Sequence, residues 1–436
     1  MVSKKNLLLS SVEISFYSFP VSFVIGSLIV NLNLIIFITI GFVYLILNKI
    51  KIKLNFVNLS LLLFFLVIIL SSYRNLNEIG TENFIKSILL LKFYLLYIVL
   101  ETLFKNTSFS VRYFFYICFY LIIFLSLDLS LQYFYGKNIF GLVPHEGRIA
   151  GVFGHEAIAG AFLQKIFLFS LIGMIFILDP KMKSKSIIIT GILAIILFGS
   201  FVASNRISFV ILVLLFLFLI ISVKIFKRNF IYAIIMFLPV FYYLYLNDPR
   251  INNKYNGFFY KAKKSIIVFN NAFSNIDEKV IKDKKPLDEL NVSLGPPGHG
   301  NIFLTSIESF KDKKVLGNGY KSFRIRCSVF VKQNKNYLCS THPHNYHLEV
   351  LHDTGIFGFF ILSIFIFSIL KRLVKKFFKL NSNYYEKIIL ALLILNLLIE
   401  IFPLKSTGGL FTTWNGTLVW ITVALLNYGK NEIKIK

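Results

Sequence analysis

The chain has 436 residues, of which 56% are hydrophobic and only 16% are charged, and its formal net charge is +26. A soluble fold of this length cannot bury so much apolar surface, so the composition predicts that a lipid bilayer is part of its solvent. The basic residues are scattered between apolar segments and do not form one stripe. We therefore expect no nucleic-acid partner and assign the charge first to membrane topology.

Twelve apolar windows are long enough to cross the hydrocarbon core of a bilayer, which takes about 20 helical residues. The sequence therefore predicts an all-α polytopic membrane protein with about 12 transmembrane helices. The windows lie at residues 12–30, 33–49, 55–72, 85–104, 112–134, 156–178, 186–203, 207–224, 230–246, 346–370, 386–402 and 411–427.

One polar stretch, residues 247–345, separates the ninth window from the tenth and is far longer than a usual connection. We expect three parts: helices 1–9 in residues 1–246, a large loop with short helices in 247–345, and helices 10–12 in 346–436.

Basic residues occur in alternate connections. Each of the segments 4–5, 49–53, 105–112, 181–185, 224–228, 371–379 and 430–436 carries at least two Lys or Arg. Cytoplasmic connections carry such an excess. The pattern therefore predicts that both termini are cytoplasmic and that the large loop lies on the outer side of the membrane.

Two arginines lie in connections that we expect outside. Arg148 precedes the sixth window, and Arg206 occupies the tight turn Ser204-Asn205-Arg206 between the seventh and eighth. Each side chain can simply reach toward lipid head groups. Alternatively, two guanidinium groups on one face can bind a phosphate or pyrophosphate. The residues alone leave both interpretations open.

The segment 339–358 contains four of the seven histidines. Pro343 favours a helix that starts near His344 or Asn345, and His344 at its mouth is a candidate general base. Ordinary interfacial histidines or a metal cluster are the alternatives. We expect no metal, because no Cys or carboxylate completes a recognisable ligand set with His344 and His347. Glu349 and Asp353 are candidates to orient a histidine.

Cys327 and Cys339 lie just before this segment. On an oxidising outer side two cysteines this close favour a disulfide, and two free thiols are the alternative.

Together these motifs resemble the O-antigen ligase/polymerase superfamily of bacterial envelope glycosyltransferases. The resemblance rests on four segments and on the twelve-span layout with its late loop. The segments are Arg148-x-x-Gly151-x-Phe153-Gly154, the Ser-Asn-Arg206 turn, Leu316-Gly317-Asn318-Gly319, and His342-Pro343-His344-Asn345 with the trailing Leu348, Leu351, Gly355 and Gly358. The chain departs from many members at His155 and Glu156, where these have an Asn-rich stretch.

The resemblance implies a GT-C-like fold in the bacterial inner membrane, with the large loop in the periplasm. It also implies a transfer without metal or cofactor from an undecaprenyl-pyrophosphate-linked glycan donor to an acceptor hydroxyl. Arg148 and Arg206 would bind the pyrophosphate and His344 would activate the hydroxyl, with His342, Asn345, His347 and Glu156 in support. The acceptor is lipid A core for a ligase and a second lipid-linked glycan for a polymerase.

Two other functions remain open. A lipid-glycan transporter needs charges at the bilayer midplane, for which Glu13, Lys92, Asp128 and Glu400 are the few candidates. A protein O-glycosyltransferase would share the chemistry and differ in its acceptor.

Overall fold

The computed structural model describes residues 4–178, 183–203, 205–260, 299–333, 337–379 and 384–426. These residues form helices and connecting segments without a strand, apart from one isolated bridge between His145 and Arg148. The predicted all-α fold is therefore confirmed for the part of the chain that is described. Residues 261–298 and 334–336 of the predicted large loop, residues 181–182 of the basic segment 181–185 and the whole basic segment 430–436 lie outside it.

The described helices follow in chain order. They are α1 (Lys4–Tyr17), α2 (Phe19–Ile25), α3 (Ser27–Leu47), α4 (Phe56–Arg74), α5 (Leu76–Leu89), α6 (Leu91–Asn106), α7 (Arg112–Tyr135), α8 (Ala159–Ile177), α9 (Lys183–Val202), α10 (Arg206–Ser222), α11 (Lys227–Asn247), α14 (His299–Lys311), α15 (Phe323–Gln333), α16 (Tyr346–Lys379), α17 (Tyr384–Glu400) and α18 (Thr413–Leu425), with 3-10 turns η1 (Gly151–Phe153) and η2 (Lys224–Phe226). Residues 249–260 are also helical.

Each of the twelve predicted windows falls on one to three of these helices, and the first, 12–30, spans parts of α1, α2 and α3. Eight helices of the described chain are long and apolar enough to cross a membrane, or nine if the bent pair α1–α2 counts as one span. α10 and α17 have 17 residues each and α18 has 13. At 1.5 Å per residue α18 is about 20 Å long, shorter than the hydrocarbon core. The number twelve stays a prediction.

Large apolar side chains cover much of the outer surface of the bundle. Leu28, Ile187 and Ile221 are 70%, 79% and 82% exposed. A surface of this kind is stable only in contact with lipid. The chain is thus a multi-pass membrane protein.

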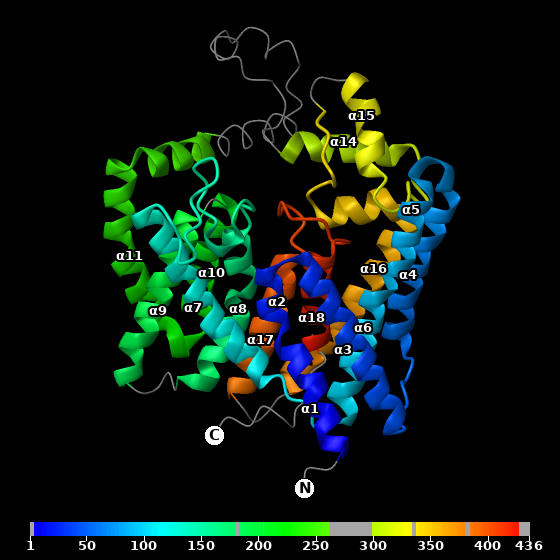
Figure 1. Ribbon diagram of the computed structural model, residues 1–436, viewed down its shortest axis with the longest axis horizontal. Helices are drawn as coiled ribbons and strands as arrows, with labels where there is room; N and C mark the ends of the chain where they lie inside the picture. The colour runs from blue at the N-terminus through cyan, green and yellow to red at the C-terminus, as the bar shows by residue number, and fades with distance from the viewer. Residues whose placement is uncertain are drawn as a thin grey trace.

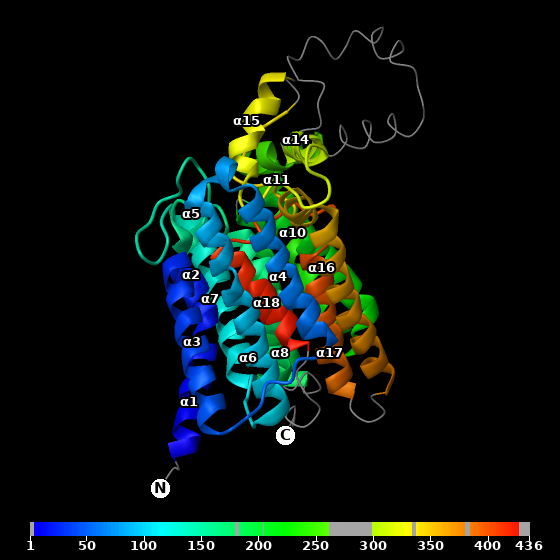
Figure 2. The ribbon, with the colours of Figure 1, turned by 90° about the vertical axis from the view of Figure 1, so that its right-hand side faces the viewer.

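The helices form two neighbouring groups in Figure 1, α7 to α11 on one side and α3 to α6 with α16 and α18 on the other. α7 packs against α8 and α9, α16 against α4, and α17 against α8. α14 and α15 lie beyond the bundle at one end, which we call the α14–α15 end. The start of α1 and the end of α18 point to the opposite end (Figures 1 and 2). This agrees with termini on one side of the membrane, although which side is cytoplasmic stays a prediction.

A break in α16 fixes the α14–α15 end to the bundle. Gly355 has φ of 68°, a left-handed conformation that interrupts the helix. The carbonyl oxygens of His352 and Asp353, which the break frees, accept the N–H groups of Asn318 and Gly319 at 2.9 and 3.0 Å. The Leu-Gly-Asn-Gly segment is therefore the hydrogen-bonding partner of the broken helix.

The two backbones meet too closely for side chains. A Cβ atom on Gly317 would lie 2.5 Å from the backbone nitrogen of Gly355, and one on Gly355 would lie 2.3 Å from the carbonyl oxygen of Val315. Glycine at both positions is what lets the segment before α15 pack on α16.

Candidate active site at the α14–α15 end

The backbone and imidazole of His344 are held by one residue, Thr407. The carbonyl oxygen of His344 accepts the Thr407 N–H at 2.8 Å, and His344 Nδ1 lies 3.2 Å from the Thr407 carbonyl oxygen. A carbonyl can only accept, so Nδ1 carries the proton and Nε2 keeps a free lone pair. The Ser340 hydroxyl donates to this Nε2 at 3.0 Å. His344 therefore presents a basic nitrogen to a hydroxyl group.

Two further imidazoles surround His344. The ring centroids of His342 and His299 lie 4.1 and 4.4 Å from its own. Burial, with smaller contributions from these two rings, lowers the pKa of His344 to about 4. Burial also lowers the pKa of His342 and of His299. The cluster is thus uncharged at neutral pH, with the Nε2 lone pair of His344 available.

This low pKa predicts the pH profile of the reaction that His344 serves. A base works only while unprotonated, so kcat/KM should stay constant from pH 8 down to about 5 and fall only as pH approaches the pKa of about 4. An ordinary histidine would lose half its activity near pH 6.5. Initial rates between pH 4.5 and 8 measure this directly, and half-loss near pH 6.5 would contradict the geometry.

Asn345 and His347 hold a second segment, residues 401–412, against the start of α16. The Asn345 amide donates to the Pro403 carbonyl at 2.6 Å while its oxygen accepts the Leu348 N–H at 3.1 Å, which caps α16. His347 Nε2 lies 2.6 Å from the Ile401 carbonyl oxygen and donates to it. These contacts position the segment that carries Thr407, so both residues support His344 indirectly.

A buried group of charges lies directly after this motif. Glu400 accepts hydrogen bonds from the Tyr346 hydroxyl at 2.6 Å, from Lys405 Nζ at 2.9 Å and from Lys165 Nζ. The three charged side chains are 8% exposed or less. One carboxylate thus joins α8, the end of α17 and the start of α16. Glu400 was one of the charged residues considered for a transporter. Its contacts give it a structural role.

Arg206 begins α10, whose N-terminus is capped by Asn205 through the Ser208 N–H at 3.2 Å. Its Nη1 donates to the Lys254 carbonyl at 3.0 Å. Lys254 in turn donates from Nζ to the end of α9, and burial together with the charge of Arg206 lowers the pKa of Lys254 to about 7. The carbonyl acceptors belong to Phe201, Val202 and Ala203. Helix 249–260 therefore packs on the turn between α9 and α10. Ser204, in this turn, lies outside the described residues.

Arg148 lies in segment 136–158 between α7 and α8. Gln132 anchors this segment, because its side-chain oxygen accepts the N–H groups of Ala150 and Gly151 at 3.0 and 2.8 Å. Arg148 itself is exposed and pairs with the exposed Glu146 at 3.3 Å. Such a surface pair stabilises little, so the guanidinium remains available to an anion.

Gly151 of the same motif fits only as glycine. Its φ is 57°, and a Cβ would lie 2.6 Å from a carboxylate oxygen of Asp128. That carboxylate accepts the Ile139 N–H at 3.0 Å. Asp128 thus holds the Arg148 segment in place. Glu156 is exposed and forms no ion pair among the residues described.

The three principal candidates lie at one end of the molecule without touching. Segment 136–158, helix 249–260 that binds Arg206, and the segment before α16 all lie toward the α14–α15 end (Figure 1). Within the described ranges no hydrogen bond or ion pair joins Arg148, Arg206 and His344 to one another.

Cys327 and Cys339 are linked by a disulfide with a Cα–Cα distance of 5.2 Å. The bridge ties α15 to the segment that leads to His344.

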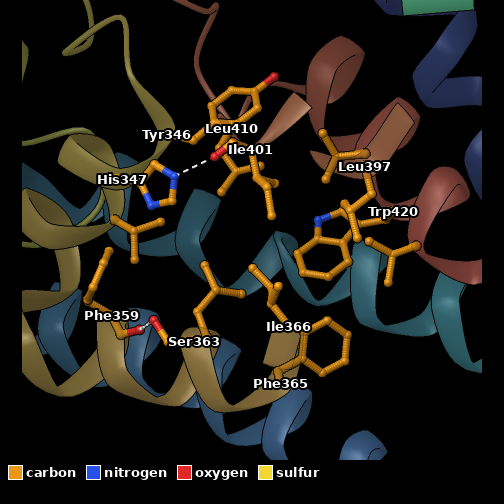
Figure 3. A pocket seen from close by; sticks show the side chains of 14 residues that line it. Tyr346, His347, Phe359, Ser363, Phe365, Ile366, Leu397, Ile401, Leu410 and Trp420 are labelled. Carbon is orange, nitrogen blue, oxygen red and sulfur yellow. Dashed lines mark hydrogen bonds between the residues drawn. The ribbon is translucent and has the colours of Figure 1, made fainter. Parts of the chain in front are cut away.

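An apolar pocket opens beside His347 between α16, α17 and α18 (Figure 3). Phe359, Leu397 and Trp420 are among the residues that line it. Among the residues described, no group of three or more His, Cys, Asp or Glu could hold a metal ion; metal independence stays a prediction.

Residues 191–363 match the family model described as O-Antigen ligase. This stretch is an O-antigen ligase domain. It runs from α9 into α16 and contains Arg206, His344 and both bridging cysteines, and the match supports the predicted superfamily. The family consists of membrane glycosyltransferases of the O-antigen ligase and polymerase type. No curated protein matches the chain.

The sequence did not predict His299, Thr407 or Lys254 as part of the site. His299 gave a weak signal, since it follows a run of Gly and Pro and lies in the same loop as His344. Thr407 acts through its backbone, and Lys254 lies in a stretch without a motif, so neither residue gave a signal in the sequence.

Proposed function

We propose that this protein transfers a glycan from an undecaprenyl-pyrophosphate carrier to an acceptor hydroxyl, at the periplasmic face of the bacterial inner membrane. The observation that carries the proposal is the Nε2 lone pair of His344, held toward a hydroxyl group by the Nδ1 contact with Thr407. The family of the O-antigen ligase domain supports a lipid-linked glycan substrate in general.

The proposed reaction is one displacement at the anomeric carbon of the donor. The acceptor oxygen forms a bond to this carbon, and the bond from the carbon to the pyrophosphate oxygen breaks. The acceptor proton passes to His344 Nε2, where the Ser340 hydroxyl lies in the absence of substrate. The bond electrons leave with the pyrophosphate, so no cofactor is required.

Arg148 and Arg206 would bind this leaving group. Both lie on the α7–α11 group of helices, whereas His344 belongs to the segment before α16. A donor between the two groups would place its pyrophosphate at the arginines and its sugar toward the base. Fixed cations beside a leaving anion lower such a barrier by several kcal/mol. The apolar pocket beside His347 offers surface for a hydrocarbon chain of a lipid substrate.

A lipid-glycan transporter is the second candidate, and the histidine favours the enzyme over it. A transporter needs no base, yet His344 is held in a left-handed conformation, φ 56°, with one nitrogen locked as a donor and the other free. Strained backbone of this kind clusters at reactive sites.

Arg148→Ala and Arg206→Ala should each lower kcat/KM for the donor by about 10²-fold, the size of losing one preorganised cationic or hydrogen-bonding group. Lysine should restore only part of the activity, because an ammonium group cannot form the planar two-pronged contact of a guanidinium. Steady-state kinetics with an undecaprenyl-pyrophosphate glycan measure this. Arg250→Ala is the control, since Arg250 is already paired with Asp248 at 2.7 Å. Unchanged donor kinetics in both variants would remove the pyrophosphate role.

A further inference from the structure

Two cations near the start of α15 lack a counter-charge. Lys321 lies two residues before α15 and Arg324 in its first turn, and neither forms an ion pair with a carboxylate in the described ranges. The next arginine is different: Arg326 binds both Glu78 at 2.6 Å and Asp312 at 2.5 Å. α15 is thus neutralised on the side of Arg326 and left positive on the side of Lys321 and Arg324.

The backbone of Lys321 is strained. Its φ is 57°, a left-handed conformation that favours glycine. The conformation is held by the Lys321 N–H, which donates to Asp353 Oδ2 at 3.1 Å, and the Lys321 ammonium lies 5.0 Å from the ring centroid of Tyr320. A lysine is therefore kept, half-buried, at a position where a glycine would be relaxed.

Two other cations and two carboxylates act on this lysine. Burial, then the charges of Arg324 and Lys86, lower the pKa of Lys321, and the carboxylates of Glu349 and Asp353 oppose this effect only in part. Glu349 is already engaged by the Leu410 N–H at 2.5 Å, and Asp353 by His352 at 2.9 Å. Lys86 pairs with the exposed Glu82 on α5. A bound anion would relieve the remaining repulsion.

One of these basic residues, Arg324, acts electrostatically on the histidine cluster. The charge of Arg324 contributes to the lowered pKa of His342, whose ring lies 4.1 Å from that of His344. The proposed donor site lies elsewhere, because Arg148 and Arg206 belong to the α7–α11 group of helices. An anion bound beside Lys321 and Arg324 would therefore belong to the other substrate, the acceptor.

We propose that Lys321 and Arg324, assisted by Lys86, form an anion site for the phosphate of the acceptor lipid and so direct its hydroxyl to His344. This inference rests on the proposed function. A phosphorylated lipid A core and a second pyrophosphate-linked glycan both supply this chemistry, and we call the three residues the Lys321 cluster.

The test measures acceptor binding without donor, in nanodiscs, for both lipids with and without their phosphates. Lys321→Gly removes the charge and relaxes the backbone, so a mere structural role predicts an unchanged or higher Tm and unchanged binding. We expect instead a dissociation constant about tenfold higher for Lys321→Gly and for Arg324→Gln. We also expect a matching rise in KM for the acceptor but not for the donor. Lys332→Gln, in the last turn of the same helix, is the control.

The two lipids are distinguished by their binding to the variants. The acceptor is the lipid that binds the variants more weakly than the wild type in its phosphorylated form but equally well without its phosphates. Equal binding by wild type and variants would overturn the inference. So would an equal loss of binding to plain phosphatidylglycerol nanodiscs, which would indicate a general site for lipid head groups. Phosphate-dependent binding without any transfer by the wild type would leave the Lys321 cluster intact and remove the proposed function.

Discussion

Replacing His344 with alanine should lower kcat for glycan transfer by about 10²–10⁴-fold, the contribution of a well-placed general base. The variant loses the Nε2 lone pair but keeps the backbone pairing with Thr407, so membrane insertion and Tm should change little. Single-turnover transfer from an undecaprenyl-pyrophosphate glycan measures the loss.

Ser340→Ala is the matched control for this experiment. The Ser340 hydroxyl only occupies the place where we expect the acceptor hydroxyl, 3.0 Å from Nε2. Its removal should leave transfer within a few-fold of wild type. Transfer by His344→Ala at the wild-type rate would exclude the histidine as the base. A loss in Ser340→Ala as large as in His344→Ala would show that the hydroxyl takes part in the reaction.

Replacing Glu400 with glutamine should destabilise the protein by about 3–5 kcal/mol, the usual cost of removing one partner from a buried ion pair. Lys165 and Lys405 would then be two buried cations without a counter-charge. The segment 401–412 that carries Thr407 would also lose one of its anchors, the contact between Glu400 and Lys405. Thermal unfolding in detergent should show a large fall in Tm, or the variant should fail to accumulate.

Glu308→Gln is the control, because Glu308 pairs with Lys311 on the surface at 2.8 Å and such pairs contribute about 0–1 kcal/mol. Lys165→Met in the Glu400→Gln background should recover part of the stability, since one of the two unpaired charges is removed. A Tm for Glu400→Gln equal to wild type would mean that this carboxylate does not hold the three elements together.

The sequence indicates the polar residues of the site but not which residues contact them. His344 was found because it lies in a histidine-rich segment and because Pro343 marks a helix start, and Asn345 indeed caps α16. Thr407 was invisible, since it uses only backbone atoms and lies 63 residues away. His299 was overlooked, because only folding of α14 onto α16 brings its ring to His344.

The same limit applies to the helices. Hydropathy located each window, because apolar runs are a property of the sequence alone. The break at Gly355 could not be predicted: Leu348, Leu351, Gly355 and Gly358 recur at helical spacing and favour a continuous helix. The break is stable only because Asn318 and Gly319 supply hydrogen bonds from a distant segment.

The most direct test of the central claim uses the purified protein in liposomes. It receives an undecaprenyl-pyrophosphate glycan, an acceptor lipid and a chelator, and released undecaprenyl pyrophosphate and glycosylated acceptor are both measured. We expect the two products in equal amounts from the wild type, and from His344→Ala we expect both to form at least about 10²-fold more slowly. Folded wild-type protein that consumes no donor, or that releases undecaprenyl pyrophosphate without glycosylating either acceptor, would contradict the proposed transfer.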